Sequence, residues 1–181
     1  TANFVRTTNL TDRYFGKTEL NWQARDGLTF VYRMGYDSFT ENQNYAQNPG
    51  GVRPEALLDG FYQTVDIIES SWEHNFNTLL DYQLTEDISF NGTVGAQYTT
   101  EKYERQGLES INMLIFDFFE HSNFIDQSST NFFNGFDFQR TVEEQQVGIF
   151  ADVTFGFQEW VYLNLAGRND WFSTLEVDNR S

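Results

Sequence analysis

The chain has 181 residues and no cysteine, which excludes disulfides and thiolate-bound metals. Its formal net charge of −16 argues against a nucleic-acid partner, because phosphate binding requires clustered cations and the chain has 11 Lys and Arg residues against 27 acidic ones. No apolar run is long enough for a membrane-spanning helix, whereas a membrane-spanning strand needs only about 9 to 11 residues with every second one apolar. With 19 Phe, 9 Tyr and only 2 Pro, the composition predicts an all-β protein.

The first hairpin is predicted around an Asp-Gly turn. In its first strand, Leu20, Trp22 and Ala24 alternate with polar residues, which is the period of a strand with one apolar face. The following pair, Asp26-Gly27, is typical of a tight turn because glycine adopts positive φ without steric cost. The second strand repeats the alternation with large apolar residues over 28–36.

Two further hairpins show the same alternation. Each has two strands joined by a turn of about three residues. The strands and turns are predicted at 72–84, 85–87 and 88–98 for one hairpin, and at 147–157, 158–160 and 161–171 for the other.

The connections between the hairpins are long. They span about 38–64 and about 100–140, and part of the second, 108–119, is compatible with a short helix. Short turns on one side and long loops on the other, along antiparallel strands, are the layout of an outer-membrane barrel. Aromatic residues end the apolar rows, as in the girdles of such barrels, namely Trp22, Tyr36, Trp72, Tyr82, Tyr98, Phe157, Trp160 and Trp171.

We expect the chain to be a piece of a larger barrel. About six strong strands, or seven to eight with the weaker terminal segments, leave two open edges. In lipid, each unpaired backbone group at such an edge costs several kcal/mol. The prediction is therefore an antiparallel transmembrane β-barrel segment that pairs with further strands.

One segment of the chain resembles a known family. The stretch VGIFADVTFGFQEWVYLNLAGRNDWFSTLEVDNRS is similar to the barrel of the SusC/RagA family of TonB-dependent outer-membrane receptors from Bacteroidetes, and RNDWFST is its most specific part. Upstream, TDRYFGKTELNWQARDGLTFVYRMGYDSFTE resembles two strands ahead of a long outer loop in that family. The residues that match the family pattern are Phe150, Val153, Phe155, Phe157, Tyr162, Leu163, Leu165, Arg168, Asp170, Trp171, Ser173, Asn179 and Arg180.

The resemblance implies a barrel of about 22 strands with an amino-terminal plug. Such a receptor imports glycans or peptides across the bacterial outer membrane with energy from TonB, and a SusD-like surface lipoprotein caps it. Residues 1–181 would then form barrel wall, in contact with outer-membrane lipid, and outer loops, while the plug lies outside this sequence. We expect neither enzymatic activity nor a cofactor.

Two other functions are compatible with the same patterns. One is a soluble, secreted all-β module that binds carbohydrate or protein through an aromatic face. The other is a small passive outer-membrane barrel of about eight strands.

Four residues of the family motif are predicted to face the barrel lumen. By alternation, Tyr162, Asn164, Arg168 and Asp170 lie opposite the apolar row of the same strand. They could contact substrate, but an Arg-Asp pair that stabilises the wall is the favoured interpretation.

Six Phe residues of the second long loop are candidates for ligand binding, because exposed aromatic rings stack on sugars or pack against a partner. The alternative is that these rings form a small core of the loop itself. The candidates are Phe116, Phe118, Phe119, Phe132, Phe133 and Phe136.

No metal or catalytic site is predicted. His74 and His121 lie far apart in the sequence with no second metal-ligand residue of the zinc type nearby. The adjacent Glu143 and Glu144 would point to opposite faces of a strand, so they cannot act together as the paired carboxylates of a glycosidase.

Overall fold

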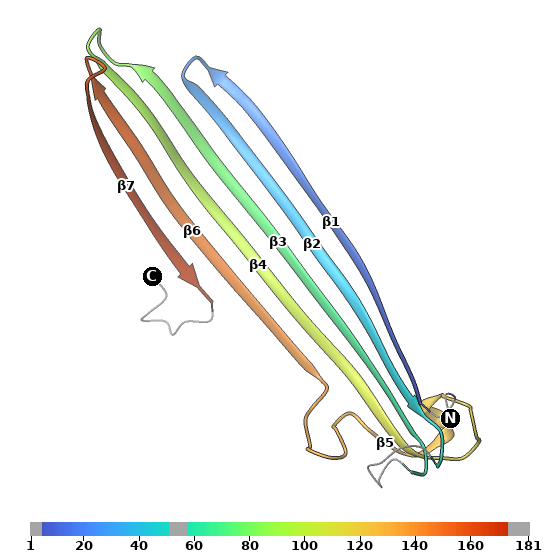
Figure 1. Cartoon of the computed structure of the whole chain (residues 1–181). Helices are drawn as coiled ribbons and strands as arrows, with labels where there is room; N and C mark the ends of the chain where they lie inside the picture. The colour runs from blue at the N-terminus through green and yellow to red at the C-terminus, as the bar shows by residue number, and fades with distance from the viewer. Residues whose placement is uncertain (1–4, 51–57, 174–181) are drawn as a thin grey trace. The chain divides into compact units, whose positions relative to one another are not determined.

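The computed structural model describes residues 5–50 and 58–173, and most of them belong to one antiparallel sheet (Figure 1). Within these residues the sheet has seven strands in the order β1-β2-β3-β4-β6-β7, and β5 pairs with β4 beside this path. No helix in the same residues is long and apolar enough to cross a membrane. The elements are β1 (Val5–Arg25), β2 (Leu28–Gln47), β3 (Phe61–Gln83), β4 (Ile88–Met113), η2 (His121–Asn123), β5 (Phe124–Ser128), β6 (Arg140–Phe157) and β7 (Val161–Phe172). The predicted all-β class is confirmed.

Contacts within the sheet group into two compact units. The hairpin unit comprises the described residues within 15–37, 71–101 and 143–181. The loop unit comprises those within 1–14, 38–70 and 102–142. The three short turns belong to the hairpin unit, and the two long connections belong to the loop unit.

The three predicted hairpins of the hairpin unit are confirmed. The β1–β2 turn uses Gly27 at a φ of 75°, as the Asp-Gly signal predicted. In the β6–β7 turn, Gln158 and Glu159 adopt positive φ values of 52° and 61°. β6 and β7 then pair continuously, from Gln146 opposite Phe172 to Phe157 opposite Val161.

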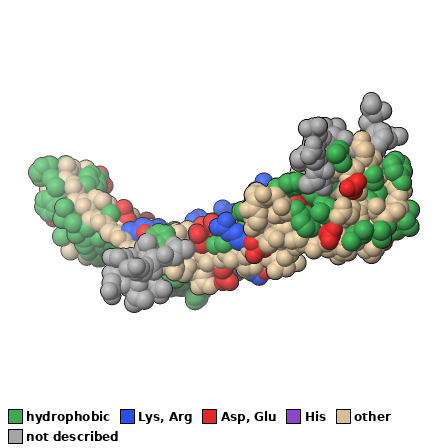
Figure 2. Space-filling model, turned by 90° about the horizontal axis from the view of Figure 1, so that it is seen from below, with side chains coloured by type: hydrophobic (Ala, Val, Ile, Leu, Met, Phe, Trp, Pro, Cys, Tyr) green, Lys and Arg blue, Asp and Glu red, His purple; other side chains and the backbone are tan. Residues whose placement is uncertain are grey.

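One face of the hairpin unit, called the apolar face below, is formed by every second residue of each strand. Ring contacts join neighbouring strands on this face, with centroid distances of 5.5 Å for Trp22–Phe30 and 5.9 Å for Phe30–Phe76. Its side chains are nevertheless exposed, Trp22 by 65% and Leu163 by 57%. Figure 2 shows hydrophobic side chains at the surface beside acidic and basic ones. Other exposed members are Leu20, Trp72, Phe76, Val94, Ile149, Phe155 and Leu165.

The opposite face, called the polar face below, is held together by hydrogen bonds between strands. Arg33 Nε donates to Glu19 Oε2 at 2.6 Å, between β2 and β1. Gln97 Nε2 donates to Glu73 Oε1 at 3.3 Å, between β4 and β3. Each strand of this unit therefore carries two chemically distinct faces.

The strands extend further than the sequence predicted. β2 continues to Gln47 and β4 to Met113, so the long connections cover 48–60 and 114–139 rather than about 38–64 and 100–140. The predicted helix at 108–119 is wrong, because its first half is β4, which pairs with β5 from Glu109 opposite Ser128 to Met113 opposite Phe124. Both faces of these strand extensions carry polar residues, so the apolar alternation that reveals a strand is missing there.

The loop unit contains most of the buried side chains in the described residues. Its buried apolar residues come from β2, β3, the start of β5 and the segment before β6. They are Ala46, Phe61, Val65, Phe124 and Phe138, each at most 6% exposed. Its buried polar residues are Gln47, Asn48, Glu109, Ser110 and Asn123, each at most 4% exposed. The described parts of the long connections therefore pack onto the strand ends.

Candidate functional site

A buried asparagine shapes the first part of the long connection after β4. The Asn123 side chain is inside a turn of the chain, where its Nδ2 donates to the carbonyls of Ile115 at 2.8 Å and Phe118 at 2.7 Å. In return, the Ile115 amide donates to Asn123 Oδ1 at 3.0 Å. With its backbone groups bonded inward, this turn leaves the side chains of Ile115 and Phe116 63% and 62% exposed.

A second set of polar contacts attaches the same turn to the ends of β1 and β2. Asn48 Nδ2 donates to Asp117 Oδ1 at 3.1 Å, and the Asp117 amide donates to Asn48 Oδ1 at 2.9 Å. Arg6 donates to the same carboxylate at 2.7 Å, and its guanidinium lies 5.5 Å from the ring centroid of Phe119. Residues 111 positions apart are thus joined at one point.

His121 of η2 connects the loop to β3 and β4. Its Nδ1 lies 2.7 Å from the Ser110 hydroxyl, and its Nε2 lies 2.9 Å from the Thr64 hydroxyl. Its ring packs against that of Tyr62 in a tilted arrangement, with 4.6 Å between the ring centroids. Ser110 is fully buried, so this Ser-His pair cannot act on a substrate from solvent. No group of three metal-ligating side chains occurs in the described part of the chain. His121 therefore has a structural role in docking the loop.

Docking of this loop is expected to depend on pH. Burial lowers the pKa of His121 below its ordinary value of 6.5, so the docked loop favours the neutral ring. The contribution is fully present above pH 6.5 and weakens as the pH falls from there toward the lower folded-state pKa. Hydrogen exchange of the Leu114 amide, which donates to the Asn123 carbonyl at 2.9 Å, should report less protection at acidic pH after correction for intrinsic rates.

The control for this pH dependence is His121→Gln. The amide can still bond the Ser110 or Thr64 hydroxyl, but it does not titrate. The difference in protection between neutral and acidic pH should shrink in this variant. An undiminished pH response would assign the effect to another group.

Glu109 holds the second part of the connection. Its buried carboxylate accepts three hydrogen bonds, from Gln63 at 3.1 Å, from the Asn131 side chain at 2.8 Å and from the Phe132 amide at 3.0 Å. None of these donors carries a charge, and burial raises the pKa of Glu109. The carboxylate thus fixes the start of a tight turn over 131–136, which Asn131 closes with bonds to the amides of Phe133 and Asn134.

The six candidate Phe residues fall into two groups on these two turns. Phe116 and Phe118 are exposed on the first turn, whereas Phe119 is half-buried at 5.9 Å from the Tyr62 ring. The other three are exposed on the second turn: Phe132 by 38%, Phe133 by 49% and Phe136 by 49%. The rings that do fill the loop core, Phe124 and Phe138, are different ones. Ligand binding by the six candidates stays a prediction.

Arg105 supports the second turn from β4. Its guanidinium lies 5.0 Å from the Phe136 ring and 5.2 Å from the Phe138 ring. Phe138 in turn packs against Gly107, where an added Cβ would come within 3.0 Å of the ring. One face of Phe136 is therefore occupied by a protein cation.

The four family-motif residues lie on the polar face and form hydrogen bonds with other residues of the sheet. Arg168 makes two hydrogen bonds of 2.7 Å to Asp170 and one of 3.2 Å to Gln97. Gly148 lies beneath this pair, and a Cβ there would collide with both side chains. Asn164 donates to Asp152 at 2.7 Å, and the Tyr162 hydroxyl donates to the Glu159 carbonyl at 3.2 Å. This geometry favours a structural Arg-Asp pair, and their placement in a lumen stays a prediction.

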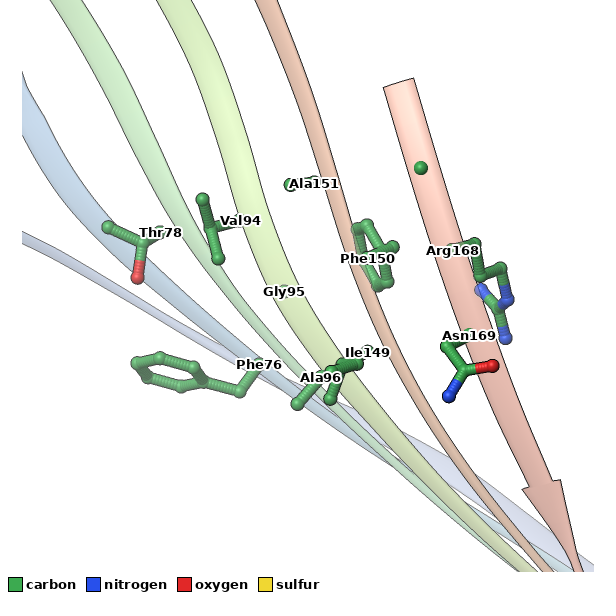
Figure 3. A pocket seen from close by; sticks show the side chains of 11 residues that line it. Phe76, Thr78, Val94, Gly95, Ala96, Ile149, Phe150, Ala151, Arg168 and Asn169 are labelled. Carbon is green, nitrogen blue, oxygen red and sulfur yellow. The ribbon is translucent and has the colours of Figure 1, made fainter. Parts of the chain in front are cut away.

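The apolar face has a shallow hollow of about 650 Å³ between β3, β4, β6 and β7 (Figure 3). Small residues form its floor, and larger apolar side chains surround them. The lining includes Phe76, Val94, Ala96, Ile149, Ala151 and Asn169. Arg168 is the one charged residue in this lining, and its side chain is bonded to Asp170 on the polar face.

Sequence reasoning missed the buried residues that position the loops. Glu109, Asn123 and His121 lie in a stretch with no apolar period. Glu109 bonds Gln63, 46 residues away, and His121 bonds Thr64, 57 residues away, while Asn123 bonds residues of its own loop. The only local signal was the density of Asn, Ser and Thr near the ends of the long connections, which is typical of capping and turn formation.

The sheet shares its fold with part of the RagAB peptide transporter. Superposition on that solved structure gives a TM-score of 0.82 at 16% identity, over 99% of this chain and 19% of the other. Two structures of the RagAB peptide importer, in "closed-closed" and "open-open" states, give TM-scores of 0.81 and 0.79 at the same identity and coverage. The chain thus spans about a fifth of the length of the solved chains that it matches.

No family model and no curated protein sequence matches the chain. The likeness at 16% identity is one of fold. It confirms the antiparallel β-fold that the sequence resemblance implied.

Proposed function

We propose that this chain is a wall segment of a nutrient importer of the SusC/RagA kind in a bacterial outer membrane. The observation that carries the proposal is the pair of faces in the hairpin unit. Leu163 and Leu165 are exposed by 57% and 54%, while Asn164 between them bonds across the polar face. A large exposed apolar surface is unfavourable in water, whereas lipid hydrocarbon accepts it.

The edges of the sheet support the same proposal. β1 and β7 each have a neighbour on one side only within the described sheet. Open edges are not viable in hydrocarbon, so a membrane location requires further strands that continue the wall. The solved chains with this fold are much longer than the present one and offer room for such strands.

Under this proposal the loop unit lies on the outer surface and the short turns face the periplasm. A SusD-like surface lipoprotein would dock on the outer loops, where Phe116, Phe132 and Phe133 present exposed rings. TonB would act through parts of the protein outside these residues. The solved structures are of a peptide transporter, which favours peptides over glycans as cargo.

The test uses single cysteines in the full-length protein, in a background without other cysteines. The present chain contains no cysteine, so within it the spin label attaches only to the introduced one. Spin labels at positions 163 and 165 should collide with lipid-soluble oxygen in phospholipid vesicles. Labels at 164 and 166 should collide with a water-soluble nickel complex instead. Uniform access to the nickel complex at all four positions would favour a soluble binding module and refute the membrane wall.

A further inference from the structure

Two arginines of the loop unit lie opposite each other on neighbouring strands. β4 and β6 are neighbours in the sheet (Figure 1). A Cβ added at Gly107 of β4 would lie 3.0 Å from the Cβ of Phe138, just before β6, so these two positions are paired and share a face. Two residues further, the antiparallel register places Arg105 opposite Arg140 on that same face. We call these two residues the arginine pair.

The same register holds in the hairpin unit. There, a Cβ added at Gly95 of β4 would collide with the Phe150 ring of β6. Gly95 lies as far before Gly107 along β4 as Phe150 lies after Phe138 along the chain. The pairing of β4 with β6 is therefore the same at both points, and the position of the arginine pair follows from it.

Neither member of the arginine pair forms an ion pair with the residues that the structure describes. Acidic residues outnumber basic ones by 27 to 11, so the absence is not due to a shortage of carboxylates. Like charges directly opposite each other on neighbouring strands are destabilising. The sheet thus holds two adjacent cations without a protein anion. Other basic residues contrast with them, since carboxylates lie at 2.6–2.7 Å from Arg6, Arg33, Lys102 and Arg168.

Aromatic rings hold the Arg105 side chain in place. Its guanidinium lies 5.0 Å from the ring centroid of Phe136 and 5.2 Å from that of Phe138. Its Nε is buried and has no hydrogen-bond partner. A guanidinium presents five N–H donors in a planar fork, and packing against rings fixes this fork without satisfying its donors. Donors that are already fixed lose less conformational freedom when they bind an anion.

A phosphate dianion matches the arginine pair in charge and in shape. Its two negative charges balance the two guanidinium groups, and its three outer oxygens can accept hydrogen bonds from both forks. A carboxylate has one charge and two oxygens, which a single bidentate arginine already satisfies. The net charge of −16 argues against a nucleic acid, which needs many clustered cations, whereas a single phosphate group needs only these two.

We propose that the arginine pair binds phosphate in its doubly charged form, either as the inorganic ion or as a monoester. Arg105, packed against Phe136 and Phe138, is the fixed half of the site, and the exposed Arg140 donates from the start of β6. Phe136 is 49% exposed and offers ring surface to the remainder of an ester. These residues all belong to the loop unit, so the site does not depend on the membrane wall.

The experiment measures binding to the full-length protein by calorimetry. The probes are inorganic phosphate, phenyl phosphate and acetate, at constant ionic strength and at a slightly alkaline pH where phosphate is doubly charged. Both phosphates should bind more tightly than acetate. Tighter binding of phenyl phosphate than of inorganic phosphate assigns the site to an ester, and equal binding assigns it to the free ion. Acetate that binds as tightly as phosphate overturns the ligand class, and binding of neither phosphate overturns the site.

Variants of the arginine pair locate the binding. Arg105→Gln and Arg140→Gln should each weaken phosphate binding by about tenfold or more, because each removes one charge and one fork. Arg140→Lys keeps the charge without the fork, so its affinity should be intermediate. Arg25→Gln is the matched control, since Arg25 also lacks an ion pair but belongs to the hairpin unit. Its affinity should stay within about twofold of the unmodified protein.

Arg140→Gln keeps the test valid if Arg105→Gln fails to fold, because Arg140 is exposed and makes no ring contact. Unchanged phosphate affinity in Arg140→Gln overturns the proposal. An equal loss of affinity in Arg25→Gln also overturns it, because the effect would then be one of net charge. The spin-label result at 163–166 is independent of these outcomes and decides the membrane wall separately.

Discussion

In the full-length protein, Leu165→Arg is expected to lower the free energy of unfolding in phospholipid vesicles by about 2–4 kcal/mol. Leu165 pairs with Val153 on the apolar face and is 54% exposed. If this face contacts hydrocarbon, a guanidinium there must leave water when the barrel inserts. The measurement is denaturant unfolding followed by tryptophan fluorescence.

The matched control is Ala166→Arg, one residue further along β7. Ala166 pairs with Asp152 and lies on the polar face, so its arginine stays in a polar environment beside a carboxylate. We expect a change within about 0.5 kcal/mol. An unchanged free energy of unfolding in Leu165→Arg would contradict a lipid contact, because arginine at a position exposed to water has little effect on stability.

Glu109→Ala is expected to release the turn over 131–136 from β4. The substitution leaves the Gln63 side chain, the Asn131 side chain and the Phe132 amide without their shared acceptor. Each buried donor without a partner costs about 1–3 kcal/mol. Hydrogen-exchange protection of the Phe132 amide should therefore fall by about 10- to 100-fold.

Two further variants test the role of the Glu109 carboxylate. Glu104→Ala is the control on the same strand, since Glu104 forms a partly exposed ion pair with Lys102 at 2.7 Å, and such pairs contribute little. Glu109→Gln should be intermediate, because its amide keeps one acceptor oxygen but places an amino group where the carboxylate had a second one. Unchanged protection in Glu109→Ala would show that other contacts hold the turn.

The hairpins and the two faces of the sheet could be predicted because they depend on local features. The Asp26-Gly27 turn and the apolar alternation over 147–157 each lie within a few residues of sequence. Period-2 patterning places side chains on one face wherever the strand pairs. The RNDWFST motif added the family resemblance, and the fold of the solved peptide transporter agrees with it.

The candidate site was predicted only in part. The six Phe residues were placed correctly on one connection, but their exposure depends on which rings the loop buries, and those are Phe124 and Phe138. The Arg168–Asp170 pair was predicted because two residues that are two positions apart in a strand lie on the same face. Its third partner, Gln97, comes from a strand 71 residues away and was not predictable from local sequence.

By itself, the sequence determined the all-β class, the turns and the amphipathic faces, since each follows from residue period and turn chemistry. Only the tertiary structure decided where the polar strand extensions end, because hydrogen bonds to neighbouring strands hold them without an apolar pattern. It also decided which polar residues are buried, as with Glu109, since a polar side chain is buried where distant partners meet its hydrogen-bonding groups.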